Sequence, residues 1–417
     1  MKKFFASAGL VTVGAVSLQA AYTPGLSPME TTKPWSLAAT LRGFYDDNYN
    51  NAPSDLRKGS AGFEISPAAR LNFPMEQTYV GLSYLYSLKY YFDRPQNKAD
   101  HLHEFTIKAD HRLTQQYKIS FDDSFVYSAE PGIVDSTGAV TAPGQRQNSD
   151  ALRNRATLEF DAQLTEIFGV VSSYQNTWYD YVKNKALEAD LNRVEHLFDV
   201  HGTWHAQEHL TALLGYTFGV EDYTSDLPLN LNPAPDTLTG NARDNTSHYF
   251  YVGVEHAFSS QLNGTARVGA QATNQKHPTR TTWNPYVDLR GTYTYLPGSF
   301  VQFGVTHTRN ATDVTGAGTE ADLVRDQEST TLFAQLTHRI TPHLSGNLLG
   351  NFQRSIYSGG SQDGNVDYYL IASANLAYQI NNNWSAEVGY NFDRLDADAA
   401  GRSFSRNRVY AGVRASF

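Results

Sequence analysis

Residues 105–122 read FTIKADHRLTQQYKISFD, and this stretch decides the fold. On either side of a turn at 113–117, apolar side chains alternate with charged or hydroxyl-bearing ones. In the first arm, Phe105, Ile107, Ala109, His111 and Leu113 share one face, whereas Thr106, Lys108, Asp110 and Arg112 share the other. A period of two places successive side chains on opposite faces of a strand. The stretch therefore predicts a β-hairpin with one apolar face and one charged face.

The same alternation recurs from Trp35 to the end of the chain, interrupted by two kinds of connection. Short turns are expected at 73–76, 113–117, 164–168, 204–208, 258–262, 295–298, 340–344 and 380–384. Longer polar segments lie at 129–150, 223–246 and 309–327. Short turns at one end and long loops at the other are typical of outer-membrane β-barrels. We expect an all-β, up-and-down antiparallel barrel of about 18 strands, with 16 to 20 compatible.

The composition narrows the class of protein further. Hydrophobic residues make up 41% of the 417 residues, and the mean hydropathy is -0.45. After the N-terminal segment there is no apolar run of the roughly 18 residues that a membrane helix needs, so a helical membrane bundle is excluded. The chain has 0 Cys, so disulfides do not hold the fold. A net charge of -9 argues against nucleic acid as a partner.

The N-terminus has the three-part layout of an export signal. Lys2 and Lys3 precede an apolar stretch at 4–18, and small residues follow at 19–21. We predict a cleaved signal over residues 1–20, a periplasmic segment over 21–34 and the barrel over 35–417. A transmembrane anchor is the weaker alternative, because the apolar run is short for a span.

The last strand resembles the C-terminal assembly signal of outer-membrane proteins. Its apolar positions alternate up to a terminal Phe417, and it contains Tyr410 and Gly412. The resemblance implies recognition by the outer-membrane assembly machinery. Ala415 departs from the pattern, in which a larger residue is usual at that position. The expected surroundings are outer-membrane lipid and lipopolysaccharide, and a homo-oligomer is compatible with the sequence.

The parity of the strands divides side chains into two sets. The outward, lipid-facing set includes Leu82, Tyr84, Ile107, Leu158, Phe160, Leu214, Val252, Val287, Leu332, Leu370 and Val388. The inward, pore-lining set includes Arg42, Glu64, Arg70, Lys89, Lys108, Asp110, Lys118, Asp122, Arg155, Glu159, Asp161, Arg267, Asp288 and Arg290. Unpaired charges cannot lie in a dry core, and about 18 strands enclose more space than side chains fill. We therefore expect a water-filled lumen that passes small polar solutes.

Five histidines are candidates for metal binding or catalysis. His101 and His103 share a strand face and could bind metal, although a third ligand is not evident. His111, His256 and His338 each stand near a short turn on the outward face, which favours an interfacial girdle over catalysis. The hydrolase, metalloprotease and phosphate-loop motifs are missing. We expect neither an enzyme nor a cofactor or metal site.

The sequence is compatible with several alternatives. A repeated hairpin also fits a β-propeller, although blades need four short strands and a buried interior. Other functions for a barrel are export of exopolysaccharide, modification of lipid, or a structural role. The segment at 129–150 would be the third outward loop. It either folds into the lumen and narrows it or lies at the surface.

Residues 41–49 read LRGFYDDNY and lead to Ile65-Ser66-Pro67 and a Tyr-rich strand. This opening resembles the putative β-barrel porin 2 family, in which an aromatic-Asp-Asn corner ends the first strand and Ser-Pro opens the second. The match covers about the first quarter of the chain; beyond it only the alternation is shared. The resemblance implies a passive outer-membrane channel, and some members accompany exopolysaccharide production.

Overall fold

The structure is a computed structural model that describes residues 33–129, 150–182, 184–229, 238–277, 279–312, 314, 322–399 and 401–417. The predicted export signal at 1–20 lies outside these ranges, as does most of the segment at 21–34. Among the described residues, no helix has both the length and the apolar character that crossing a membrane requires.

Eighteen strands form one closed antiparallel sheet. They are β1 (Trp35–Asp46), β2 (Ser60–Pro74), β3 (Thr78–Tyr91), β4 (Ala99–Arg112), β5 (Tyr117–Ser128), β6 (Ala151–Gln163), β7 (Phe168–Tyr181), β8 (Arg193–Gln207), β9 (Leu210–Tyr223), β10 (Asn245–Ala257), β11 (Leu262–Gln275), β12 (Arg280–Leu296), β13 (Ser299–Asn310), β14 (Asp326–Arg339), β15 (Leu344–Ser358), β16 (Val366–Gln379), β17 (Trp384–Ala397) and β18 (Phe404–Ser416). Helix α2 (Lys185–Leu191) and the short 3-10 turns η2 (Gly240–Arg243) and η4 (Gly360–Gln362) lie in the long connections. The predicted 18-stranded barrel is confirmed.

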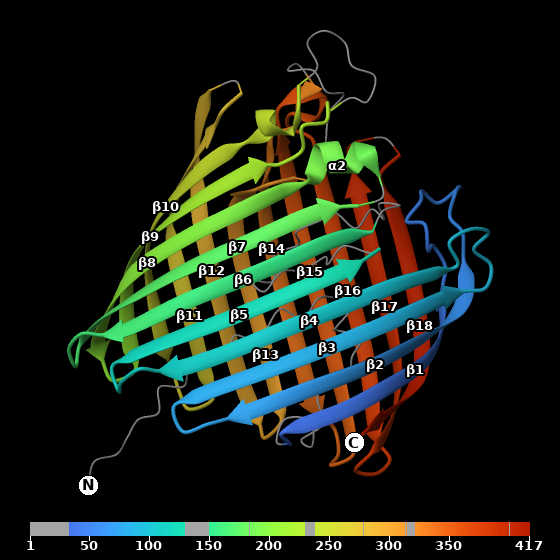
Figure 1. Cartoon of the computed structure of the whole chain (residues 1–417), viewed down its shortest axis with the longest axis horizontal. Helices are drawn as coiled ribbons and strands as arrows, with labels where there is room; N and C mark the ends of the chain where they lie inside the picture. The colour runs from blue at the N-terminus through green and yellow to red at the C-terminus, as the bar shows by residue number, and fades with distance from the viewer. Residues whose placement is uncertain are drawn as a thin grey trace.

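The barrel closes between its first and last strands. β18 pairs with β1 from Ala38 opposite Ser416 to Asp46 opposite Arg408. Beyond this ladder, Leu37 and Phe417 exchange backbone hydrogen bonds of 2.8 and 3.1 Å. Figure 1 shows the start of β1 and the C-terminus at the end of the barrel where the turns are short, with α2 at the opposite end. The closed sheet leaves no strand without a neighbour on either side.

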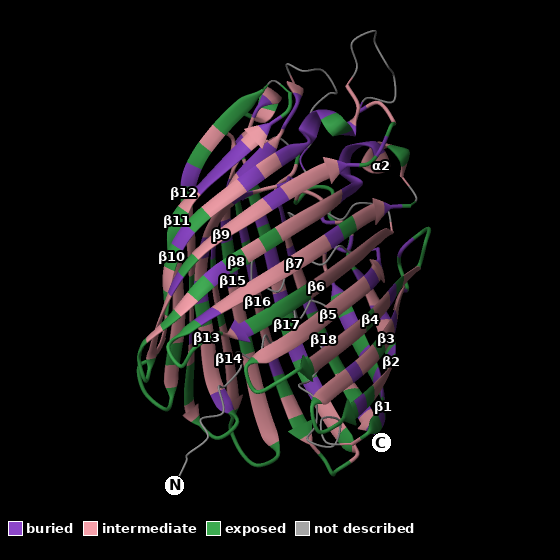
Figure 2. Ribbon diagram, turned by 60° about the vertical axis from the view of Figure 1, so that its left-hand side comes forward, coloured by how far each residue is buried: buried purple, intermediate pink, exposed green. Residues whose placement is uncertain are grey.

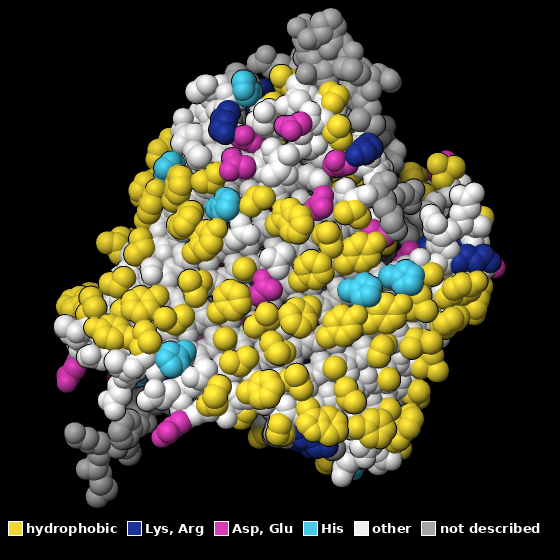
Figure 3. All heavy atoms as spheres, in the orientation of Figure 1, with side chains coloured by type: hydrophobic (Ala, Val, Ile, Leu, Met, Phe, Trp, Pro, Cys, Tyr) yellow, Lys and Arg dark blue, Asp and Glu magenta, His cyan; other side chains and the backbone are white. Residues whose placement is uncertain are grey.

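The wall of the barrel is apolar outside and polar inside. Along β1, exposed and buried residues alternate without interruption. Leu37 and Leu41 face outward and are exposed, whereas Thr40 and Arg42 face inward and are buried. Figure 2 shows exposed and buried bands on several other strands and intermediate burial over much of the wall, and Figure 3 shows apolar side chains covering the outer face. The predicted lipid-facing residues, from Leu82 to Val388, all lie on this outward face in the register of their strands.

Inward aromatic rings lie over glycines of the neighbouring strand. Tyr410 stands opposite Gly389, where an added Cβ would lie 2.2 Å from the tyrosine ring. Tyr251 crowds Gly215 in the same way, at 2.1 Å. Gly412 in β18 has its backbone against Arg42, whose Cγ would be 2.7 Å from an added Cβ. The glycines thus admit large inward side chains between adjacent strands, a pairing known to stabilise sheets.

Deleting Phe417 should impair assembly because it removes the residue that extends the closing ladder to Leu37. We expect a clear loss of folded, heat-modifiable protein in outer-membrane fractions, read by gel mobility of unheated and heated samples. Phe168→Ala is the matched control, since Phe168 is also an exposed aromatic at a strand end. Equal amounts of folded protein with and without Phe417 would contradict the assigned role.

Candidate functional site

One part of the inner wall, over β4 to β6, carries charges that reach water inside the barrel. Lys108 lies 3.5 Å from Asp122, and Lys118 lies 2.8 Å from Asp110. The side chains of the two lysines are 39% and 40% exposed. Glu159 on β6 faces inward as well and is exposed. Charges that face inward and stay exposed indicate a lumen wide enough for water.

The wall over β1, β2, β17 and β18 has buried charges instead. The Arg42 Nε donates to Glu387 at 2.5 Å, and its Nη1 lies 3.4 Å from Glu64. The Arg42 side chain is only 3% exposed and that of Glu387 only 1%. Higher on the same wall, Arg406 donates to Asp393 at 2.9 Å through Nε. These ion pairs join strands to one another and are closed off from the lumen.

The remaining predicted pore residues fall between these two extremes. Arg290 donates to Asp288 at 2.8 Å, and Arg155 donates to Gln175 at 2.6 Å. The Arg267 guanidinium lies over the Tyr251 ring at 5.4 Å. Asp161 is exposed, while Arg70 and Lys89 are half-buried. The alternation along the strands therefore predicts which residues face inward but does not separate buried from exposed ones. Arg42 joins neighbouring strands within the wall and does not line the water-filled lumen.

The opposite, loop-bearing end of the barrel is narrowed by strand β13, which turns inward. On one side, β12 stays paired with β11 as far as Arg280. On the other side, its pairing with β13 ends earlier, where Val287 stands opposite His307. Past that point, the backbone N–H of Arg309 donates 2.8 Å to the inward side chain of Gln271. The end of β13 and the start of its loop consequently lie inside the line of the wall.

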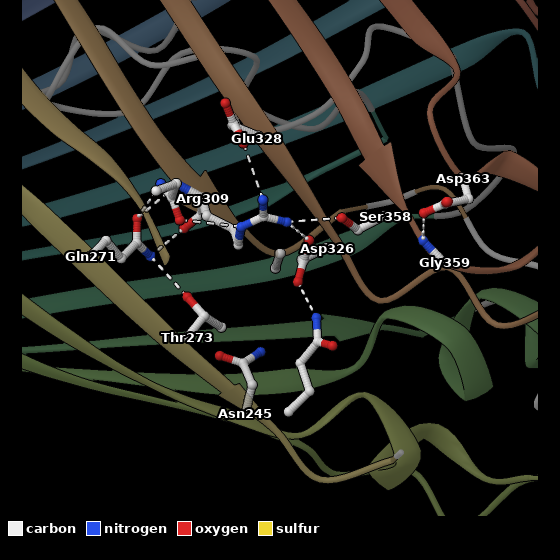
Figure 4. A network of polar contacts seen from close by, with 12 residues as sticks. Asn245, Gln271, Thr273, Arg309, Asp326, Glu328, Ser358, Gly359 and Asp363 are labelled. Carbon is white, nitrogen blue, oxygen red and sulfur yellow. Dashed lines mark hydrogen bonds and ion pairs between the residues drawn. The ribbon is translucent and has the colours of Figure 1, made fainter. Parts of the chain in front are cut away.

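A polar network around Arg309 fastens this inward segment (Figure 4). Its guanidinium donates 2.5 Å to Asp326, 2.9 Å to Ser358 and 3.1 Å to Glu328. Asp326 also accepts a hydrogen bond from Gln275. Residues of β11, β13, β14 and β15 are thereby joined at one point.

Arg243 clamps three extracellular segments together. It is buried, and its guanidinium donates to the carbonyls of Asp190, at 2.6 Å, and Thr312. It also lies over the Tyr223 ring at 4.5 Å. Nearby, Lys276 donates 2.9 Å to Asp244, a hydrogen bond that raises the pKa of the lysine above its ordinary value.

Apolar contacts complete this clamp at the mouth of the barrel. Leu229, Ala242 and Leu323 form one buried cluster, and Val314, Val324 and Tyr357 form a second. The clusters combine residues of the β9–β10 loop, the β13–β14 loop and β15. Residues 309–312, 314 and 322–327, which are the described residues of the loop expected at 309–327, therefore narrow the mouth. Of the segment at 129–150, expected either to fold into the lumen or to lie at the surface, residues 130–149 lie outside the described residues.

The five histidines singled out in the sequence lie on the outward face. His111 bonds Thr78 at 2.8 Å, His256 bonds the carbonyl of His209 at 2.9 Å, and His338 bonds Tyr295 at 2.8 Å. His101 and His103 bond Tyr86 and Tyr84, each at 2.9 Å. Within the part of the chain that the structure describes, no group of three or more His, Asp or Glu is placed to hold a metal ion.

The closed sheet, its lipid-facing exterior and its hydrated charged interior define a multi-pass β-barrel of the bacterial outer membrane. The model of the family described as putative beta-barrel porin 2 matches residues 232–417. The expected resemblance to that family is thus confirmed over the second half of the chain. The matched range contains β10 to β18, so it lies outside the first quarter of the chain, where the quoted motif stands.

Comparison with curated proteins finds no match. Among solved structures, Pseudomonas aeruginosa OccK3 (OpdO) shares 13% identity and a TM-score of 0.44, covering 92% of this chain and 95% of that one. Pseudomonas aeruginosa OccK2 (OpdF), in complex with glucuronate, shares 10% identity and a TM-score of 0.44, covering 92% and 98%. The siderophore receptor PiuA from Acinetobacter baumannii shares 10% identity and a TM-score of 0.45, covering 93% and 82%.

Replacing Arg42 by methionine should destabilise the barrel by roughly 3 kcal/mol, because it removes the cation that donates to the buried Glu387 and lies beside Glu64. Lys118→Met, on the hydrated wall, should cost less than about 1 kcal/mol. Adding Glu387→Gln to Arg42→Met should restore part of the loss. The measurement is denaturant unfolding of the detergent-solubilised protein followed by tryptophan fluorescence. An equal loss of unfolding free energy in Arg42→Met and Lys118→Met would contradict the distinction between a buried and a hydrated part of the wall.

Replacing Arg243 by methionine should widen the mouth, because the β13–β14 loop loses its tie to the segment before β8. We expect higher single-channel conductance with an unchanged unfolding midpoint of the barrel. Lys185→Met on α2 is the control, since this lysine is largely exposed and pairs only within its helix among the described residues. Unchanged conductance in correctly folded protein would show that the constriction lies elsewhere.

Proposed function

We propose that the protein is a passive diffusion channel for small hydrophilic solutes and carries out no chemical step. The observation that supports this most directly is the hydrated wall of β4 to β6, where Lys118 and Lys108 stay exposed within a closed barrel. Exposed charges of both signs stabilise water and polar solutes in the lumen. Transport then follows the concentration gradient, and the width and charge of the path set its rate.

The mixture of charges also favours small solutes over a polysaccharide exporter. An exporter of an acidic polymer would be expected to have an inner wall dominated by arginine. Here acids stand beside bases on the same or neighbouring strands: Asp110 with Lys118, Asp122 with Lys108 and Asp288 with Arg290. Each charge is thus partly compensated locally, which suits weak contacts with many polar solutes. The loop cluster at the mouth limits the size of what enters.

Changing the charge of the hydrated wall should change ion selectivity. In Lys108→Glu with Lys118→Glu, two bases become acids within a Debye length of about 8 Å, and we expect the cation-to-anion permeability ratio to rise severalfold. Asp110→Lys with Asp122→Lys should shift it in the opposite direction. Reversal potentials in planar bilayers under a salt gradient give the ratio.

Lys185→Glu serves as the control, because this lysine lies on α2 outside the lumen wall. If all three variants keep the reversal potential of the unaltered protein, ions do not pass along β4 to β6 and the proposal is wrong. A bilayer that stays non-conducting after well-folded protein has been added would also contradict the proposed diffusion channel.

A further inference from the structure

A row of polar side chains crosses the lipid-facing surface of β5 to β8. We name it the polar stripe, and its members are Asp123, Asn154, Asn176 and His196. Asn154 donates 2.8 Å to Asp123 Oδ1, and Asn176 donates 3.3 Å to Nδ1 of His196. The register makes the row continuous, because Asp123 stands opposite Ala156, Ala156 opposite Asn176, and Asn176 opposite His196.

The stripe starts inside the hydrocarbon layer. On β5 the outward residues on either side of Asp123 are Phe121 and Phe125, and the strand has Tyr117 and Tyr127 near its two ends. At about 3.3 Å per residue and a tilt of about 40°, Asp123 lies roughly 15 Å above the level of Tyr117. The apolar band of such barrels is about 25 Å tall. A carboxylate at this depth has no water to solvate it.

Other outward carboxylates among the described residues stand near the loop-bearing ends of their strands, where headgroups and water are close. Asp180, Asp222, Glu328 and Asp396 are of this kind. Asp123 therefore differs from them in depth. Its second oxygen, Oδ2, accepts no hydrogen bond from any residue that the structure describes. Acyl chains cannot supply a donor, so the stripe calls for a protein partner.

We propose that the polar stripe is the contact surface for a second copy of this chain, related by a two-fold axis along the membrane normal. A two-fold contact places the same patch of each copy against itself, so the patch must be self-complementary. The amides of Asn154 and Asn176, at its centre, both donate and accept hydrogen bonds and can pair with the asparagines of the second copy. Two identical barrels also lie at the same depth in the membrane, so the polar stripes of the two copies lie at the same height along the membrane normal.

The residues around the polar stripe would allow a second copy of the barrel to approach closely. Ala156 lies at its centre and offers little bulk between the two asparagines. Phe121, Trp178 and Phe198 face outward around it and can form an apolar rim. At the upper end, Tyr174 bonds Nδ1 of His196 at 2.8 Å. With Nδ1 accepting, the neutral imidazole carries its proton on Nε2, which is a further donor.

The chain has 0 Cys, which makes a single-cysteine cross-link a clean test. Ala156→Cys at the centre of the stripe should form a disulfide-linked dimer in outer membranes treated with copper phenanthroline. This requires the two Cα atoms to come within about 7 Å. Val388→Cys, outward on β17 and exposed, is the matched control and should stay monomeric. A monomeric Ala156→Cys protein, or equal cross-linking at both sites, would overturn the proposal.

A second experiment removes the amides that are proposed to form hydrogen bonds between the two copies. Asn154→Leu with Asn176→Leu should convert the dimer to monomer in mild detergent, read as a halved protein mass by light scattering. Because leucine suits a lipid-facing position, the barrel should stay folded and heat-modifiable. His248→Leu, outward on β10 beyond the stripe, is the control and should keep the dimer. A dimer that survives the double substitution, or an unaltered protein that is monomeric in both detergent and native membranes, would refute the assignment.

Discussion

The backbone ladder between β1 and β18 is the interaction on which the rest of the structure depends. In a bilayer, an open sheet edge would expose a row of N–H and C=O groups to hydrocarbon, at a cost of several kcal/mol for each unpaired group. Pairing Ala38 with Ser416 and Asp46 with Arg408 removes that edge. Once the sheet is closed, every residue must face either lipid or the interior. The inverted distribution of apolar and polar side chains follows from this constraint.

Closure also creates two environments for inward charges. Along β1 and its neighbours, Arg42, Glu64 and Glu387 are shielded by adjacent side chains and pair directly across strands. Over β4 to β6, Lys118 and Asp110 are also paired, yet water reaches them. The first kind of pair stabilises the wall, because either partner alone would be a buried, uncompensated charge. The second kind contributes little to stability and determines what the lumen attracts.

The two ends of the barrel differ because short turns join the strands at one end and long loops join them at the other. At the periplasmic end, connections such as the one between Ile340 and Leu344 are tight turns with internal hydrogen bonds. At the extracellular end, the connections are long enough to fold against one another, and a single buried arginine, Arg243, holds segments that are far apart in sequence. The inward bend of β13 at Arg309 turns that loop assembly into a constriction. Width at the mouth is therefore a property of loop packing, while the number of strands sets the width of the barrel.

From the sequence by itself, alternation with a period of two determined the barrel, its strands and the side on which each residue stands. This works because parity is local: Lys108 and Ile107 differ by one position and so face opposite sides. The turn and loop lengths likewise determined the orientation of the two ends. Only the tertiary structure decided that Arg42 is sealed in the wall while Lys118 meets water, since burial depends on neighbours such as Glu387 that are distant in the chain. It also decided that the loop following Arg309 narrows the mouth, because the partners of that loop, Gln271, Asp326 and Arg243, come together only when the sheet has closed.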